Sequence, residues 1–218
     1  MWFVKIFTYI CIFSIFFNNL SVSHVQHYSE LKSITFEIYR NNKHIGEHSF
    51  VFSNYPDKNE LQVTSKINFK IKKLGVVLYK YFAEGTEVFK DGKLIKFNSK
   101  TDQNGKLKYV NLELKDKSLI IDGSSFKGKT NPEHLLGTWW NHSLVKAPAQ
   151  ISAVSGRIIY QKVDFLGKET IKIGNKTYET LRFKFISTDN KMKENKKLNT
   201  DVWYDEKTLN WVKASFDK

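Results

Sequence analysis

The residues with the clearest chemical potential stand side by side: Trp139, Trp140, Asn141 and His142, in the stretch HLLGTWWNHSLV. Two indole rings offer a broad apolar surface, and the amide and imidazole that follow can donate or accept hydrogen bonds. Because ligand pockets combine an apolar lining with a few polar groups, we predict that these four residues bind a hydrophobic or amphipathic molecule. The alternative is structural: the tryptophans fill the core, and Asn141 and His142 cap backbone groups of a connection.

A second apolar stretch runs from Leu74 to Phe82 and contains Tyr79 and Tyr81, which we add to the ligand-binding candidates. Its side chains are apolar at both alternating positions, which is typical of a central strand covered on both faces. We predict such a covered strand. The alternative is a surface that another molecule covers, and the preceding lysines would then suit a lipid or a partner protein. These lysines are Lys70, Lys72 and Lys73.

Enzyme chemistry has little support in the sequence. The chain contains no Gly-x-Ser-x-Gly elbow, no His-Glu-x-x-His motif, no glycine-rich phosphate loop and no cysteine outside the N-terminal apolar run. His44 and His48 share one face of a strand, but in the arm of a hairpin such histidines are more often surface residues than metal ligands. We therefore expect no catalytic residue, no metal and no cofactor, although an unrecognised hydrolase stays open.

The N-terminus has the features of a secretory signal peptide. Lys5 precedes the apolar run IFTYICIFSIFF, and the small residues Ser21 and Ser23 suit a signal peptidase. We predict a signal peptide over residues 1–23, a flexible tail over 24–32 and a single β-rich domain over 33–218. The apolar run is shorter than the roughly 20 residues that span a bilayer, although residues 2–20 could instead remain as an uncleaved anchor.

Export would carry the mature chain across a membrane and out of the cytoplasm. The single cysteine, Cys11, lies within the predicted signal peptide. The mature domain therefore has no disulfide and depends on its packed core. Since no cysteine lies near the predicted cleavage site, we expect no lipid anchor.

The net charge of +13 at pH 7 raises the question of an anionic partner. Of the 35 basic residues only Arg40, Arg157 and Arg182 are arginines, whereas recognition of bases and phosphates favours the guanidinium fork. We therefore expect no nucleic-acid partner. A weak contact with an anionic membrane surface is better supported, and the lysine-dense stretch from Asp189 to Asn199 could contribute to it. That stretch is also typical of a solvated hairpin tip.

Apolar and polar residues alternate with a period of two along much of the chain, which predicts strands with one buried face. The clearest cases are Ile34-Phe36-Ile38, Ile67-Phe69-Ile71, Val110-Leu112-Leu114 and Leu181-Phe183-Phe185. Turn residues separate them at Asn41-Asn42, Asp91-Gly92, Asn104-Gly105, Asp116-Lys117, Gly174-Asn175 and Asp205-Glu206. We predict a mainly β fold, a single strongly curved antiparallel meander of about ten to twelve strands that forms a partial or closed barrel.

One interval between strands has a different character. Asn131 is a capping residue and Pro132 would occupy the first helical position, which is typical of a helix start. We predict one short helix from Pro132 to Leu136, which Gly137 ends. The Trp-rich segment that follows would cross the concave face of the sheet.

Several motifs in a fixed order resemble an exported bacterial family, domain-of-unknown-function family 6134, and are similar in layout to family 3108. They are Phe36 to Asn41 with Ile45-Gly46, Val63 to Lys70, Tyr79-Lys80-Tyr81, Glu87 to Leu94, Trp139-Trp140-Asn141, Trp203-Tyr204-Asp205 and Trp211-Val212-Lys213. The resemblance spans about Ile34 to Phe216. It implies a bacterial periplasmic protein with a β-rich fold and supplies no activity. Relatives carry basic or histidine residues after the Tyr-x-Tyr step, where this chain has Phe82-Ala83-Glu84.

Two functions of different class are compatible with these features. The first is an exported binding module whose cavity holds a hydrophobic or amphipathic ligand, such as a lipid or an envelope precursor. The second is a non-enzymatic envelope structural or protein-interaction module with a filled core. A cavity beneath the tryptophans would favour the first, and a solid interior beside an exposed apolar edge would favour the second.

Overall fold

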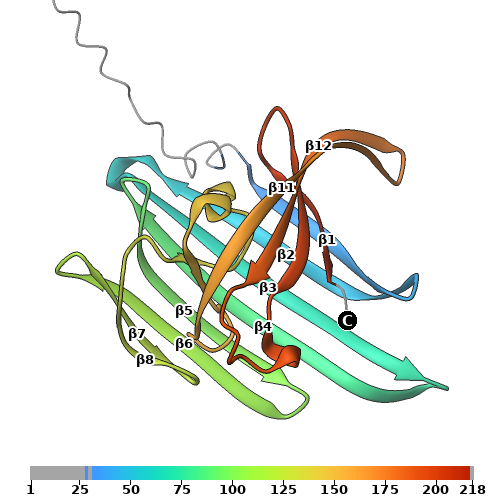
Figure 1. The fold of residues 1–218 in the computed structure, drawn as a ribbon, viewed down its shortest axis with the longest axis horizontal. Coiled ribbons are helices and arrows are strands. Elements are labelled where there is room, and N and C mark those ends of the chain that lie inside the picture. The colour runs from blue at the N-terminus through green and yellow to red at the C-terminus, as the bar shows by residue number, and fades with distance from the viewer. Residues whose placement is uncertain (1–27, 29–30, 217–218) are drawn as a thin grey trace, which may run out of the picture.

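The computed structural model describes residue 28 and residues 31–216. The predicted signal peptide and most of the predicted tail lie outside these residues. The described residues form two open β-sheets, one of eight and one of six strands (Figure 1). The prediction of a mainly β protein is therefore confirmed.

The larger sheet is an antiparallel meander in which each strand pairs with its neighbour in the chain. Its strands are β1 (Ser33–Arg40), β2 (Lys43–Tyr55), β3 (Glu60–Lys73), β4 (Val76–Lys90), β5 (Lys93–Gln103), β6 (Lys106–Lys115), β7 (Ser118–Gly123) and β8 (Lys127–Thr130). Alternation sets the faces: on β5, Phe97, Ser99 and Thr101 are buried while Asn98 and Lys100 are exposed. One face thus supplies the core and the other faces outward.

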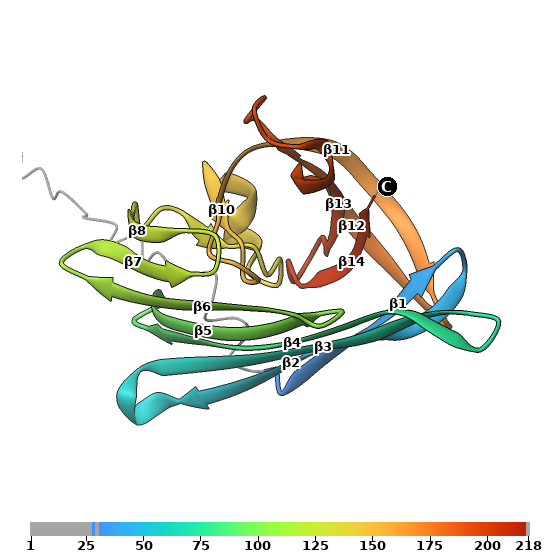
Figure 2. The same cartoon turned by 90° about the horizontal axis from the view of Figure 1, so that it is seen from below.

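The smaller sheet has the order β14-β13-β12-β11-β10-β9. Its strands are β9 (Leu135–Leu136), β10 (Ala149–Ile151), β11 (Ile158–Ile173), β12 (Lys176–Ser187), β13 (Asn199–Asp205) and β14 (Trp211–Phe216). Only β9 and β10 pair in parallel. Figure 2 shows this sheet above one face of the larger sheet, with the connection after β8 between the two.

Two clusters of buried residues fill the space between the sheets. One contains Trp140 with Phe50, Phe52, Phe89 and Tyr204. The other surrounds Phe97 and Leu112 and extends to Leu136 and Ile151 of the smaller sheet. Both clusters join side chains from the two sheets, so the sheets share one packed interior.

The predicted single meander closing toward a barrel is wrong. After β8 the chain leaves the larger sheet, and β9 to β14 pair with one another. Neither sheet closes on itself. Alternation is the same whether a later strand extends an existing sheet or begins a second one, so the local pattern could not distinguish the two arrangements.

The predicted helix from Pro132 to Leu136 is also wrong. The Asn131 side chain accepts a hydrogen bond from the Glu133 amide at 2.8 Å and closes a turn, and Leu135–Leu136 becomes β9. A segment this short gains little as a helix, because nucleation is unfavourable. The described helical elements are three short 3₁₀ turns: η2 (Pro56–Lys58), η3 (His142–Lys146) and η4 (Glu194–Lys196). No helix in the described part of the chain is long and apolar enough to cross a membrane.

The turns of the larger sheet gather at its two ends, because successive strands run in opposite directions (Figure 1). We call the end formed by residues 39–45, 70–81 and 102–108 the ribbon end. It holds the β1–β2, β3–β4 and β5–β6 turns. The β7–β8 turn, residues 124–126, lies on the same side of the sheet but is not part of this group. We call residues 54–60, 88–95 and 113–120, around the β2–β3, β4–β5 and β6–β7 turns, the opposite end.

Candidate functional site

Trp140 is fully buried between the two sheets. Its ring meets Tyr28, Phe52 and Phe89 edge to face, with centroids 5.1 to 5.5 Å apart. Its Nε1–H donates to the Glu87 carboxyl at 2.8 Å. Edge-to-face contacts and a satisfied indole N–H are what a core position requires, so Trp140 fills the interior.

Glu87 is not among the site residues predicted from the sequence, because Glu84 and Glu87, three residues apart on a strand, are expected to point to opposite faces and not to form an acid–base pair. The Glu87 carboxyl is buried, and burial raises its pKa to about 7, against the opposing effect of the hydrogen bond from Trp140. The signal was present in the alternation, since Glu87 occupies the same inward register as Gly85 and Phe89. Glu84 lies on the outer face, so the two carboxylates do not cooperate.

Trp139 adopts a strained backbone conformation. Its φ is +56°, and the Trp140 amide donates to the Thr138 carbonyl at 2.8 Å, which makes a γ-turn of the rare positive-φ form. The Tyr204 hydroxyl donates to the Trp139 carbonyl at 2.9 Å and holds this turn. The Trp139 ring is half-buried beside Trp211, and its Nε1 has no hydrogen-bond partner among the described residues.

Asn141 and His142 belong to the same packed connection. The Asn141 side chain accepts from the Ser143 amide at 3.1 Å and caps η3. The His142 ring lies edge-on to Tyr204, 4.8 Å between centroids. Buried Gln161 ties this turn to β11 by donating to the Leu144 and Ala147 carbonyls, both at 3.1 Å. These contacts support the structural alternative for this segment.

Tyr79 and Tyr81 lie elsewhere. Tyr81 is six residues before Glu87 on β4, roughly 20 Å along an extended strand, so the tyrosines do not join the tryptophans. Tyr81 stacks on Phe69 with 5.0 Å between centroids, and burial raises its pKa to about 12. Tyr79 packs against the same ring at 6.0 Å. The six candidates thus form two separate groups.

The stretch predicted as a covered central strand is instead the uncovered tip of a hairpin. Pairing of β3 with β2 ends at Phe69, and pairing of β4 with β5 begins at Tyr81. Residues 70–80 therefore form a two-stranded ribbon beyond the sheet. Leu74 is 95% exposed and Val76 62%, and Val77 and Leu78 are exposed as well. The covered-strand prediction is wrong because no neighbouring strand reaches this far.

The ribbon turn has unusual chemistry. Five hairpin turns of the larger sheet have positive φ at both central residues, the geometry that favours asparagine, aspartate or glycine. Their residues are Asn41-Asn42, Leu74-Gly75, Asp91-Gly92, Asn104-Gly105 and Asp116-Lys117. Only the β3–β4 turn begins with a branched apolar residue. Leucine in this conformation costs about 1 kcal/mol, and its exposed side chain gains nothing in return within the fold.

Two open hollows lie on the outer face of the larger sheet. They share Glu84, Lys100 and Tyr109, which stand opposite one another on β4, β5 and β6. Both lie on the face away from Trp140.

No three His, Cys, Asp or Glu side chains of the described residues are arranged to hold a metal. The His44 ring contacts Tyr39. The His48 ring packs against Phe50 and Trp211, and its burial lowers the pKa of His48 to about 4.

Comparison with known proteins gives one finding. The family model described as Domain of unknown function (DUF6134) matches residues 36–218, which confirms the predicted resemblance. No curated protein and no solved structure matches the chain.

Proposed function

The chain belongs to the family of domains of unknown function DUF6134, and from its geometry we propose that it is an exported, non-enzymatic docking module of the bacterial cell envelope. After export to the periplasm, the ribbon end of the larger sheet binds a hydrophobic or amphipathic partner. The packed interior serves as the rigid support for this end.

One observation carries the proposal: residues 70–80 expose apolar side chains on both faces of a ribbon that no other strand covers. Soluble proteins rarely leave contiguous apolar surface uncovered unless something binds it. An isolated two-stranded ribbon is also marginally stable in water. A partner that covers the ribbon would remove both costs.

The contrast with the crossing segment supports this assignment. The four residues from Trp139 to His142 make contacts within the protein: the Tyr204 hydroxyl and the Trp211 ring for Trp139, a carboxyl for Trp140, an amide for Asn141 and aromatic rings for His142. Leu74 contacts so little that it is almost fully exposed. The ribbon exposes Leu74, Val76, Val77 and Leu78 within five residues of one hairpin, whereas the other exposed large apolar side chains, such as Phe165 and Leu166 on β11, lie on other parts of the chain. This run of apolar surface at one tip favours an interaction module over a carrier with an internal cavity.

The test is to titrate the exported chain with zwitterionic detergent micelles and to follow the backbone amide signals by NMR. We expect the largest shifts in residues 70–80, with little change at Trp140. Shifts centred on Trp139 to His142, or no shift at the ribbon at saturating detergent, would overturn the proposal.

A second candidate is a small-ligand site beside Trp139, favoured by its strained turn and by an indole N–H with no partner among the described residues. Native mass spectrometry of the exported protein tests it. A co-purifying molecule that is lost in Trp139→Phe, a variant that keeps an aromatic ring at this position and removes the N–H donor, would support this site. The same molecule lost in Leu74→Asn would instead place it at the ribbon.

A further inference from the structure

Charge separates the ribbon end from the rest of the larger sheet. The ribbon end has eight basic residues and one acidic residue, a formal +7: Arg40, Lys43, Lys70, Lys72, Lys73, Lys80, Lys106 and Lys108 against Asp102. The opposite end has five of each sign, a formal charge of zero: Lys58, Lys90, Lys93, Lys115 and Lys117 against Asp57, Glu60, Asp91, Glu113 and Asp116. The excess of positive charge is therefore a property of one end.

The cations of the ribbon end are close to one another. Lys70 and Lys80 stand directly opposite on β3 and β4, a pairing that is unfavourable between like charges. Asp102 lies 3.6 Å from Lys80. Beside the β5–β6 turn, burial and then the nearby charges of Lys106, Arg157 and Lys196 lower the pKa of Lys108.

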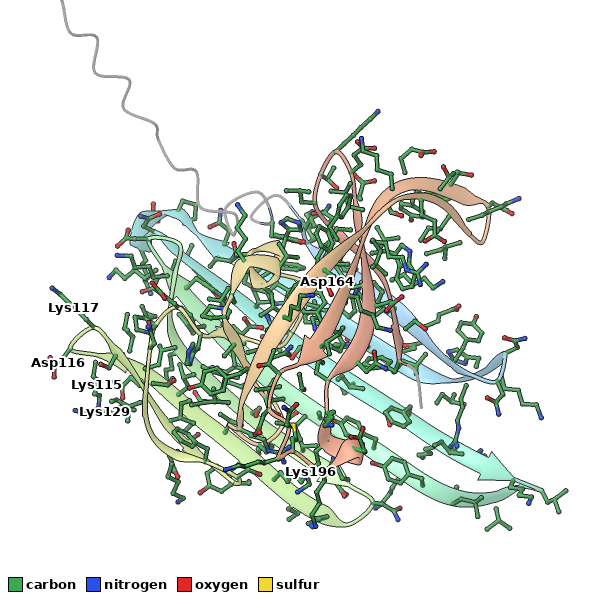
Figure 3. The ribbon with its side chains drawn as sticks, viewed as in Figure 1. Lys115, Asp116, Lys117, Lys129, Asp164 and Lys196 are labelled. Atoms are coloured by element: carbon green, nitrogen blue, oxygen red, sulfur yellow. The ribbon has the colours of Figure 1, made fainter. Side chains whose placement is uncertain are left out.

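Lys196 comes from the lysine-dense stretch between β12 and β13. Figure 3 places it over the β5–β6 side of the molecule, whereas Lys115, Asp116, Lys117 and Lys129 lie together at the opposite end. The stretch that the sequence analysis linked to a membrane surface thus adds positive charge near the ribbon end. An anionic partner would relieve this repulsion.

Apolar side chains stand among these cations. Leu107 is 79% exposed beside the β5–β6 turn, and Tyr39 is exposed beside the β1–β2 turn. With Leu74, each of the three turns at this end presents a large apolar group. An apolar tip surrounded by lysines is the pattern of protein segments that lie in the interface of anionic membranes.

We propose that the ribbon end docks on an anionic lipid bilayer, with Leu74 and its flanking valines entering the headgroup region and the surrounding lysines contacting lipid phosphates. This inference rests on the proposed function and names its partner. A protein groove would cover one face of a ribbon, whereas a bilayer surrounds both faces, and both faces of this ribbon are apolar. Each arm beyond Phe69 and Tyr81 extends roughly 13 Å, enough for the 5–10 Å depth of interfacial segments.

The experiment measures sedimentation of the full exported chain with vesicles. Vesicles of phosphatidylcholine alone are compared with vesicles that contain one-third phosphatidylglycerol. We expect at least about tenfold tighter binding to the anionic vesicles at low salt, since each lysine near such a surface adds attraction. Most of this preference is expected to disappear in high salt, where the Debye length falls to about 3 Å.

Two variants separate the apolar from the electrostatic contribution. Leu74→Asn places a favoured residue in the turn, so it is expected to fold at least as well as the wild type and to bind both kinds of vesicle about tenfold more weakly. Lys72→Gln with Lys73→Gln is expected to reduce binding to anionic vesicles about tenfold and to leave binding to phosphatidylcholine unchanged.

Matched controls remove the same groups elsewhere on the sheet. Val51→Asn replaces an exposed apolar side chain in the middle of β2 by the same polar residue, and Lys115→Gln with Lys117→Gln removes two charges from the opposite end. Neither is expected to change binding by more than about twofold. Equal loss in the control variants would overturn a site at the ribbon end and leave only general attraction to a basic protein.

The two proposals fail in distinguishable ways. If micelles shift the ribbon signals but the vesicles show no anionic preference, the docking module stands and the anionic bilayer is wrong. A chain that ignores every vesicle, yet whose ribbon becomes protected from hydrogen exchange when an envelope protein is added, would replace the bilayer with a protein partner. If neither micelles nor vesicles engage the ribbon, both proposals are wrong.

Discussion

The two ends of the larger sheet solve the same structural problem with different residues. The ribbon end and the opposite end each contain three hairpin connections between antiparallel strands, and both use turns with positive φ. At the opposite end, the two-residue turns begin with Asp91 and Asp116, and the formal charge is zero. Among the described residues of this end, one large apolar side chain is exposed: Tyr55, at 44%. At the ribbon end, leucine begins one turn, apolar tips are exposed, and the formal charge is +7.

The requirements of folding explain the residues of the opposite end, but they do not explain those of the ribbon end. The opposite end follows turn preference, charge balance and burial together, as a sequence selected for its fold does. The ribbon end departs from all three within residues 70–80: leucine begins the turn, Lys70 faces Lys80, and Leu74 is exposed. Departures that coincide are expected at functional sites, where another interaction compensates for them.

The largest expected effect is the loss of stability when a side chain of the packed interior is truncated. Trp140→Ala removes a ring that contacts Tyr28, Phe52 and Phe89. We expect the free energy of unfolding to fall by about 3–5 kcal/mol, measured by urea denaturation. Leu74→Ala, matched as a truncation at the ribbon, is expected to change stability by less than about 0.5 kcal/mol. Similar losses in both variants would show that the ribbon is covered within the protein.

The next effect concerns pH and Glu87. Below its ordinary pKa of 4.5 the carboxyl is protonated in both states, and between 4.5 and about 7 the unfolded chain loses the proton while the folded protein keeps it. The contribution of Glu87 to the free energy of unfolding should therefore fall by up to about 3 kcal/mol as pH rises through this interval. Burial lowers the pKa of His48 to about 4, so His48 contributes in the opposite direction, and the effect of Glu87 is measured as the difference between Glu87→Gln and the wild type. Glu87→Gln removes that decrease, as denaturation at pH 5 and pH 8 would show.

The same pH series sharpens the comparison. Because Leu74 lies far from Glu87, the stability difference between Leu74→Asn and the wild type should be the same at pH 5 and pH 8. A difference that changes with pH would mean that the ribbon and the interior are coupled.

A smaller change in stability is expected when leucine, the residue that begins the ribbon turn, is placed in a turn at the opposite end. Asp91→Leu puts leucine at the first central position of the β4–β5 turn and removes an acceptor for the Asn59 side chain. We expect a loss of about 1–2 kcal/mol of stability, measured by urea denaturation. No gain in vesicle binding is expected, because this end lacks an excess of lysines. A neutral effect on stability would remove the premise that leucine is unfavourable in such a turn.

The smallest effect is the reciprocal change at the ribbon. Leu74→Asn should raise the free energy of unfolding by about 1 kcal/mol, since asparagine tolerates positive φ and gives up no buried contact. Differential scanning calorimetry of both proteins measures the rise in melting temperature. If the variant is less stable than the wild type, Leu74 contributes to the fold and its exposure needs another explanation.

Local chemistry made much of the fold predictable. Alternation identified strands correctly because the period of two is a property of each strand alone, and Asn41-Asn42, Asp91-Gly92, Asn104-Gly105 and Asp116-Lys117 form the turns that their residues favour. The Leu74-Gly75 turn was not predicted, since leucine gives no turn signal. The same absence of a signal led to the wrong prediction of a covered strand.

The candidate site was predictable as a set of residue types and not as a set of contacts. The sequence marked Trp139 to His142 and the two tyrosines, and the structure divides them between an interior connection and the base of the ribbon. The alternation predicts that Glu87 is an inward-facing carboxylate, but it does not predict that Glu87 binds Trp140. Its partner is 53 residues away in the chain, and no local pattern specifies such a distance.

The sequence by itself determined the mainly β class, most hairpin turns and the family, because each depends on neighbouring residues or on the order of short motifs. The tertiary structure alone decided that the strands form two sheets, that Trp140 is interior and that the ribbon is exposed. These outcomes depend on which distant strands reach a given residue, and burial is decided by those neighbours rather than by the residue's own type.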